Sequence, residues 1–139
     1  IVLDRYAFAR SLPLQAVLVH SARTRSGNGP VLLIHRGAER LDVAIAERGA
    51  LLLSSSYPAR TAADVLYFCL LATERTGQKP ATISLRIGGT HITHADRDLL
   101  GRYFPDAAPA RPSSQTAPLP DSIEADRWLA AFEQSVCVS

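Results

Sequence analysis

Three short apolar segments between residues 31 and 56, separated by turns, constrain this chain more than any other feature. Residues 31–35 form a continuous apolar run, which is typical of a strand buried on both faces. Residues 41–46 alternate between large apolar and smaller or polar side chains, which predicts a half-buried strand. Residues 50–56 follow a glycine turn at 47–49 as a third strand. Because strands joined by tight turns pair antiparallel, the segment predicts a three-stranded meander.

An apolar helix is expected after the meander. Thr61 and Asp64 have the spacing of a capping box, and Gly77 and Pro80 end the helix. Residues 65–72 are apolar on almost every side, whereas a surface helix has a single apolar stripe. We therefore expect both sides to be covered, one by the sheet and the other by a second helix, a partner chain or the remainder of a larger protein.

A fourth strand and a second capped helix extend this pattern. Residues 82–87 alternate as a strand does, and the glycine-rich segment 88–90 ends it. Thr93 and Asp96 can form a second capping box, for a helix that reaches Tyr103. The order β-β-β-α-β-α predicts an α/β fold, with a mixed sheet and helices on its faces.

The segments on either side of this pattern are less regular. Residues 1–13 have helical spacing, and residues 14–20 are an apolar run that predicts a strand. Residues 105–120 contain five of the nine prolines and predict an extended loop. Residues 121–136 predict a terminal helix.

The composition is that of one globular domain. The 139 residues are 47% hydrophobic and 20% charged, and the net charge of +2 is too small to favour a nucleic-acid partner. The two cysteines, Cys69 and Cys137, cannot form a disulfide scaffold and fit a reducing cytoplasm. No apolar run is long enough to span a membrane. The chain has no Met and begins at Ile1, which predicts a fragment or a processed product.

Two polar segments are candidate sites. Gly88 and Gly89 lie where a strand meets a helix, which is where ligands bind in open α/β sheets; the alternative is a tight turn. His91 and His94 stand near Asp96 and could be taken for metal ligands. Because Asp96 suits the capping position, we interpret this segment as a polar helix start and expect no metal site.

The remaining reactive or charged residues are given structural roles. Cys69 lies in the most apolar segment, where a thiol is inert packing, so no catalytic nucleophile is assigned. A loose basic cluster is interpreted as a solvated surface, with phosphate, protein or RNA contact as the alternative. The cluster consists of Arg23, Arg25, Arg36 and Arg40.

Two of these motifs resemble a superfamily. Residues 31–37 with the hairpin after them resemble the second phosphate motif of the actin, sugar-kinase and heat-shock-chaperone superfamily, where an apolar strand ends in Asp-x-Gly. Residues 83–90 with the following helix resemble its adenosine motif. The resemblance implies a ribonuclease-H-like or actin-like ATPase subdomain. It also implies that residues 31–139 are a C-terminal lobe and that residues 1–30 connect it to an N-terminal lobe absent from this chain.

Residues 56–68 carry a narrower resemblance. Their sequence, Ser-Tyr-Pro-Ala-Arg-Thr-Ala-Ala-Asp-Val-Leu-Tyr-Phe, is similar to a helix in an uncharacterised Bacteroidetes family, domain-of-unknown-function family thirty-eight twenty-two. That family implies a bacterial protein with a divergent actin-like ATPase fold and no assigned activity.

The chain departs from the superfamily at one decisive position. His35 stands where the phosphate motif has Asp, although Gly37 is kept, and Mg²⁺ prefers oxygen ligands. We therefore predict a catalytically silent binding or assembly module, whose partner is the N-terminal lobe, another protein or a second copy. The alternative is an ATPase or phosphotransferase that uses ATP and Mg²⁺ once the absent lobe closes its cleft. The residues that would line this cleft are His35, Gly37, Gly88, Gly89 and Thr90.

Overall fold

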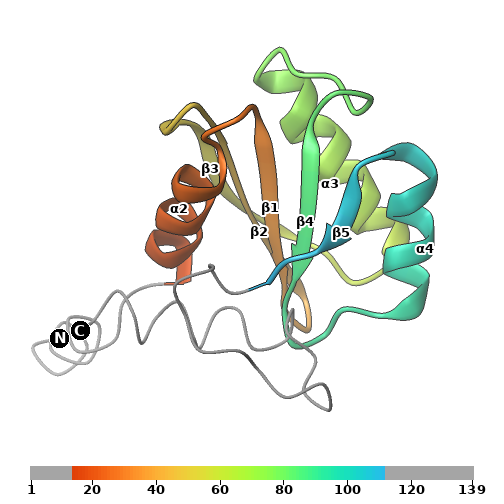
Figure 1. The fold of residues 1–139 in the computed structure, drawn as a ribbon. Helices are drawn as coiled ribbons and strands as arrows, with labels where there is room; N and C mark the ends of the chain where they lie inside the picture. The colour runs from red at the N-terminus through yellow and green to blue at the C-terminus, as the bar shows by residue number, and fades with distance from the viewer. Residues whose placement is uncertain (1–13, 112–139) are drawn as a thin grey trace, which may run out of the picture.

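The computed structural model describes residues 14–111 as a mixed five-stranded sheet with helices on both faces (Figure 1). Strand β1 pairs antiparallel with β2 and parallel with β4, β2 also pairs antiparallel with β3, and β4 also pairs parallel with β5. The order across the sheet is β3-β2-β1-β4-β5, which confirms the predicted α/β class and mixed sheet. The elements are α2 (Leu14–Arg25), β1 (Val31–Arg36), β2 (Arg40–Glu47), β3 (Ala50–Pro58), α3 (Ala62–Arg75), β4 (Ser84–Gly88), α4 (His94–Tyr103) and β5 (Ala107–Pro109).

The prediction of a strand over residues 14–20 is wrong, because these residues form the first part of helix α2. A short apolar run cannot be assigned to a strand or a helix by periodicity alone, and here the burial pattern decides. The buried residues of α2 recur at helical spacing, so one side of the helix faces the sheet. They are Val17, Leu18, Ser21 and Ala22.

Helix α2 also overturns the prediction that residues 41–46 form a half-buried strand. All six of these residues in β2 are buried. Ala44 and Ala46 pack with Leu18 of α2 on one face of the sheet. Val43 lies in the larger core on the other face, which α3 and α4 cover (Figure 1). The alternation therefore separates two buried faces, and the small residues mark the face that α2 approaches.

The predicted turns and caps are confirmed. Arg48 and Gly49 both have positive φ, 52° and 81°, as a tight hairpin turn requires. Both capping boxes are formed, by Thr61 with Asp64 at α3 and by Thr93 with Asp96 at α4. These local signals depend on few residues, which is why they could be recognised in the sequence.

In the part of the chain that the structure describes, helix α3 is covered by the sheet and by α4 beside it. Cys69 and Ala72 are fully buried, whereas Tyr67 is 60% exposed. Tyr67, Leu70 and Leu71 line a groove of about 610 Å³. Within residues 14–111 part of α3 is left exposed, so a partner chain or the remainder of a larger protein stays open as the second cover.

The last described segment differs from the predicted loop over 105–120, because Ala107–Pro109 form β5 beside β4. The helices predicted over 1–13 and 121–136, and the loop after residue 111, lie outside the described residues. The division at residue 30 stays a prediction. Among the helices of residues 14–111, none is long and apolar enough to cross a membrane.

Candidate functional site

The predicted site residues meet at one edge of the sheet, where β1 and β4 end. Because these strands are parallel neighbours, their carboxyl ends lie side by side, and His35 is in register with Gly88. Gly37 follows β1 directly, and Gly89 and Thr90 follow β4. The predicted residues thus lie close to one another, and the contacts at this edge determine what they can do.

Gly89 brings the β4–α4 turn against the end of β1. Its φ is +124°, and a Cβ built on it would lie 2.4 Å from the backbone nitrogen and oxygen of Arg36. The backbone nitrogen of His91 then donates a hydrogen bond to the Arg36 carbonyl at 3.2 Å. The glycine is required because two backbone segments touch here, which is the tight-turn alternative of the sequence analysis.

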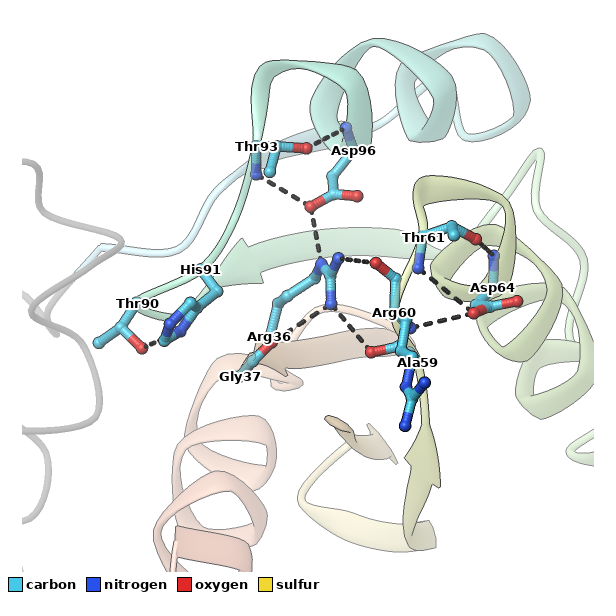
Figure 2. A network of polar contacts seen from close by, with 10 residues as sticks. All are labelled: Arg36, Gly37, Ala59, Arg60, Thr61, Asp64, Thr90, His91, Thr93 and Asp96. Carbon is cyan, nitrogen blue, oxygen red and sulfur yellow. Dashed lines mark hydrogen bonds and ion pairs between the residues drawn. The ribbon is translucent and has the colours of Figure 1, made fainter. Parts of the chain in front are cut away.

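The side chain of Arg36 is buried and joins three segments of the chain, as Figure 2 shows. Its Nε donates to Asp96 Oδ2 at 2.8 Å. Its Nη1 and Nη2 donate to the carbonyl oxygens of Ala59 and Arg60 at 3.2 and 3.1 Å. The guanidinium therefore ties the end of β1 to the β3–α3 connection and to the start of α4. The prediction of a solvated Arg36 is wrong.

Asp96 both caps helix α4 and pairs with Arg36, and the second role was not predicted from the sequence. Its Oδ2 accepts from the Thr93 backbone nitrogen at 2.9 Å, as the capping box requires, and also from Arg36. Its carboxylate is fully buried, so the pair with Arg36 is shielded from water. The two residues are 60 positions apart, and the only local signal was a charged residue directly after an apolar strand.

His35 occupies the face of the sheet opposite to Arg36, in register with Asp42 of β2. It is only 7% exposed, and neither ring nitrogen has a hydrogen-bond partner. Burial lowers the pKa of His35 below its usual value, and the nearby Asp42 carboxylate opposes that shift only in part. The imidazole is therefore neutral at pH 7.

Asp42 is itself buried and already satisfied. Arg40 Nε donates to its Oδ1 at 3.0 Å, and the Ser56 hydroxyl donates to the same oxygen. Because Ser56 donates to a carboxylate and not to His35, the three residues do not form a base-activated nucleophile. Arg40, Asp42 and Ser56 are therefore partners of one another, and His35 stays outside their network.

The other basic residues also make contacts within the protein. Arg23 Nε donates to the carbonyl of Gly49 at 2.8 Å, and Arg25 Nε donates to Ser21 Oγ at 2.9 Å. With Arg36 buried, the four arginines do not form one solvated basic surface.

The edge does not fit Mg²⁺ or a phosphate group. Neutral His35 offers nitrogen where Mg²⁺ requires oxygen, and the adjacent guanidinium of Arg36 is already bonded to Asp96 and to carbonyls. No group of three His, Cys, Asp or Glu residues among positions 14–111 could hold a metal ion. Cys69 is fully buried and burial raises its pKa, so the thiol stays protonated in the folded protein.

The described residues form an α/β unit with a mixed five-stranded sheet, and this fold is similar to an actin-like ATPase fold. A crystal structure of a Bacteroides thetaiotaomicron protein, with an actin-like ATPase fold and unknown function, matches with a TM-score of 0.60 and 18% identity. The match covers 68% of this chain and 38% of that chain. The chain belongs to the family "Protein of unknown function (DUF3822)", whose model matches residues 1–106. A search of curated proteins found no significant match. The resemblances seen in the sequence, to this family and to an actin-like fold, are confirmed.

Proposed function

We propose that this chain is a catalytically silent binding or assembly module with an actin-like fold. The observation that carries the proposal is His35, a buried neutral imidazole at the position where the phosphate motif would supply a carboxylate. Phosphoryl transfer depends on oxygen ligands that hold Mg²⁺ against the phosphates. The neighbouring Arg36 and Asp96 support the proposal, because they bond to each other instead of facing a ligand.

The partner of such a module has to cover the exposed side of α3. Tyr67 is 60% exposed in the described structure and lines a mainly apolar groove. Because the chain spans only 38% of the similar Bacteroides protein, an N-terminal lobe is one candidate partner and a second copy is another. The buried free thiol of Cys69 supports a reducing compartment, which we take to be the cytoplasm.

The alternative is a nucleotide-binding ATPase or phosphotransferase. The position of His35, Gly37 and Gly88 at the carboxyl ends of parallel strands supports it, since ligands of open α/β sheets bind there. In this alternative the N-terminal lobe supplies the missing ligands for ATP and Mg²⁺.

Calorimetric titration of the full-length protein with ATP and Mg²⁺ separates the two functions. The proposed function predicts no binding heat at millimolar ATP and no release of phosphate. Saturable, Mg²⁺-dependent binding would overturn it. If binding is seen, the variant Gly37→Ala tests whether ATP binds at this edge of the sheet. A Cβ at Gly37 would make only an ordinary 3.6 Å contact with the Arg40 carbonyl, so the variant should keep its fold and a loss of binding would report on the site.

A further inference from the structure

Within residues 14–111, strand β3 is an open edge of the sheet. The strand order places β3 and β5 at the two edges. β5 is three residues long and ends in Pro109, as protected edges commonly do. β3 is nine residues long, and residues 50–57 contain no charged residue and no proline. A long uncharged edge leaves backbone N–H and C=O groups free to pair with another strand.

We propose that β3 pairs antiparallel with β3 of a second copy, around a two-fold axis at Ser55. This inference rests on the proposed assembly function and names its partner. The register places Leu53 opposite Tyr57 of the second copy. It also places Ser54 opposite Ser56, and Ser55 opposite its own equivalent. Two five-stranded sheets would thereby join into one continuous sheet.

The irregularity within β3 favours this register. The pairing of β2 with β3 shifts between Ile45 and Ala46, so Leu52 has no partner residue in β2. The ladder around Ser55 uses only residues 53–57, which pair regularly with β2. Moving the axis by half a residue would set Leu53 against a serine from the other face of the sheet.

The side chains of β3 suit self-pairing on both faces. Leu53 and Tyr57 lie on the α3 face, partly buried against the core, so the register forms two equivalent aliphatic–aromatic pairs. Ser54 and Ser56 are exposed on the α2 face and are small enough to lie opposite each other. No like charges are brought together, because the strand carries none.

A row of aromatic rings connects this edge to the exposed side of α3. Tyr57 stacks on Phe68 with ring centroids 4.5 Å apart, and Phe68 meets Tyr67 edge-on at 5.0 Å. A five-residue ladder alone buries less than the roughly 1,200 Å² typical of a stable interface. Since the register puts both α3 helices on the same side of the joined sheet, their exposed tyrosines can supply the remaining contact area.

Disulfide trapping tests the axis directly, in a Cys137→Ser background of the full chain. The axis brings the two Ser55 Cα atoms to about 4.5–5.5 Å, which is within the range of a disulfide. The two Ser54 Cα atoms would be diagonal neighbours at about 7–8 Å. We expect Ser55→Cys to give a covalent dimer on mild oxidation and the matched control Ser54→Cys to give at least tenfold less.

Charge substitution at the same position tests the interface in solution by size-exclusion chromatography with light scattering. We expect Ser55→Lys and Ser55→Glu each to be monomeric, because like charges meet at the axis, and an equimolar mixture of the two to recover the dimer. Thr82→Lys is the control, since Thr82 is exposed and precedes β4, three strands away from β3. Circular dichroism checks whether each variant is folded. If a Ser55 variant is unfolded, Tyr67→Arg is tested in its place.

Two results would overturn the pairing: a wild-type chain that stays monomeric at all concentrations, or a dimer that neither the Ser55 charges nor Tyr67→Arg weakens. The ATP titration is independent of both. A monomer that binds no ATP contradicts only the β3 interface, whereas a dimer that binds ATP contradicts only the silent function.

Discussion

Gly89 shows how strongly single positions constrain this edge of the sheet. Alanine at this position would have to adopt a positive φ, and its Cβ would lie 2.4 Å from the Arg36 backbone. The β4–α4 turn would therefore have to move away from the end of β1. We expect Gly89→Ala to lower the free energy of unfolding by about 2–5 kcal/mol, measured by urea denaturation. Gly27→Ala is the control, because no atom lies within 4 Å of its Cβ and its φ is not positive. Equal losses in both variants would contradict the close approach.

The buried imidazole of His35 makes stability depend on pH. Because burial lowers its pKa in the folded state, the folded protein binds fewer protons than the unfolded chain, whose His pKa is about 6.5. The stabilising contribution is complete above about pH 6.5 and is lost as the pH falls toward the lowered pKa. We expect the wild type to lose more stability between about pH 7.5 and about pH 5.5 than His35→Gln does.

Urea denaturation across that pH range checks this prediction. The pKa values of Asp64 and Asp106 are lowered below an already acidic value, so these carboxyl groups titrate outside the window. Parallel stability curves for wild type and His35→Gln would show that the imidazole does not cause the slope.

The gathering of the site residues could be predicted from the sequence, but the bonds among them could not. Two strand patterns, each ending in glycine or histidine, place His35 and Gly88 together by the rule for parallel strands. The bond between Arg36 and Asp96 joins residues 60 positions apart, and its burial depends on packing by α3 and α4. No local pattern contains that information.

At the scale of elements, the start of α4 depends on one carboxylate. Asp96 caps the helix and neutralises Arg36, and both side chains are buried. Asp96→Ala leaves the guanidinium without its charged partner, so we expect a loss of about 3–5 kcal/mol in the free energy of unfolding. Asp98→Ala on the same helix removes only an exposed pair with Arg102 and should cost less than about 1 kcal/mol. Thermal unfolding of the two variants is measured under the same conditions. Similar losses of stability for Asp96→Ala and Asp98→Ala would contradict this prediction.

Two of the three errors at this scale originate in α2. Leu14 to His20 is too short and too uniformly apolar for its period to be read, so it was predicted to be a strand. Without that helix, Ala44 and Ala46 had no element to cover them, and β2 was predicted to be half exposed. β5 was missed because prolines argue against strands, although Pro109 is tolerated at the edge.

At the scale of the whole molecule, two packed layers protect the sheet unequally. The larger core lies between the sheet and helices α3 and α4, and contains Cys69, Leu85 and Phe104. The core under α2 is smaller and contains mainly small residues, such as Ala22 and Ala44. A chemical probe in the larger core therefore measures the opening of the part of the fold that contains most of the buried apolar residues.

Cys69 is such a probe, because its thiol is fully buried and burial raises its pKa. In the Cys137→Ser variant, we expect a thiol reagent to label Cys69 only when the core opens, about 10³-fold or more slower than a free thiol. Since opening follows the free energy of unfolding, Gly89→Ala should accelerate labelling, whereas Gly27→Ala should not. The measurement is the labelling rate against urea concentration. Rapid labelling without denaturant, with no difference between the two glycine variants, would mean that Cys69 becomes exposed by local motion of α3 and not by opening of the shared core.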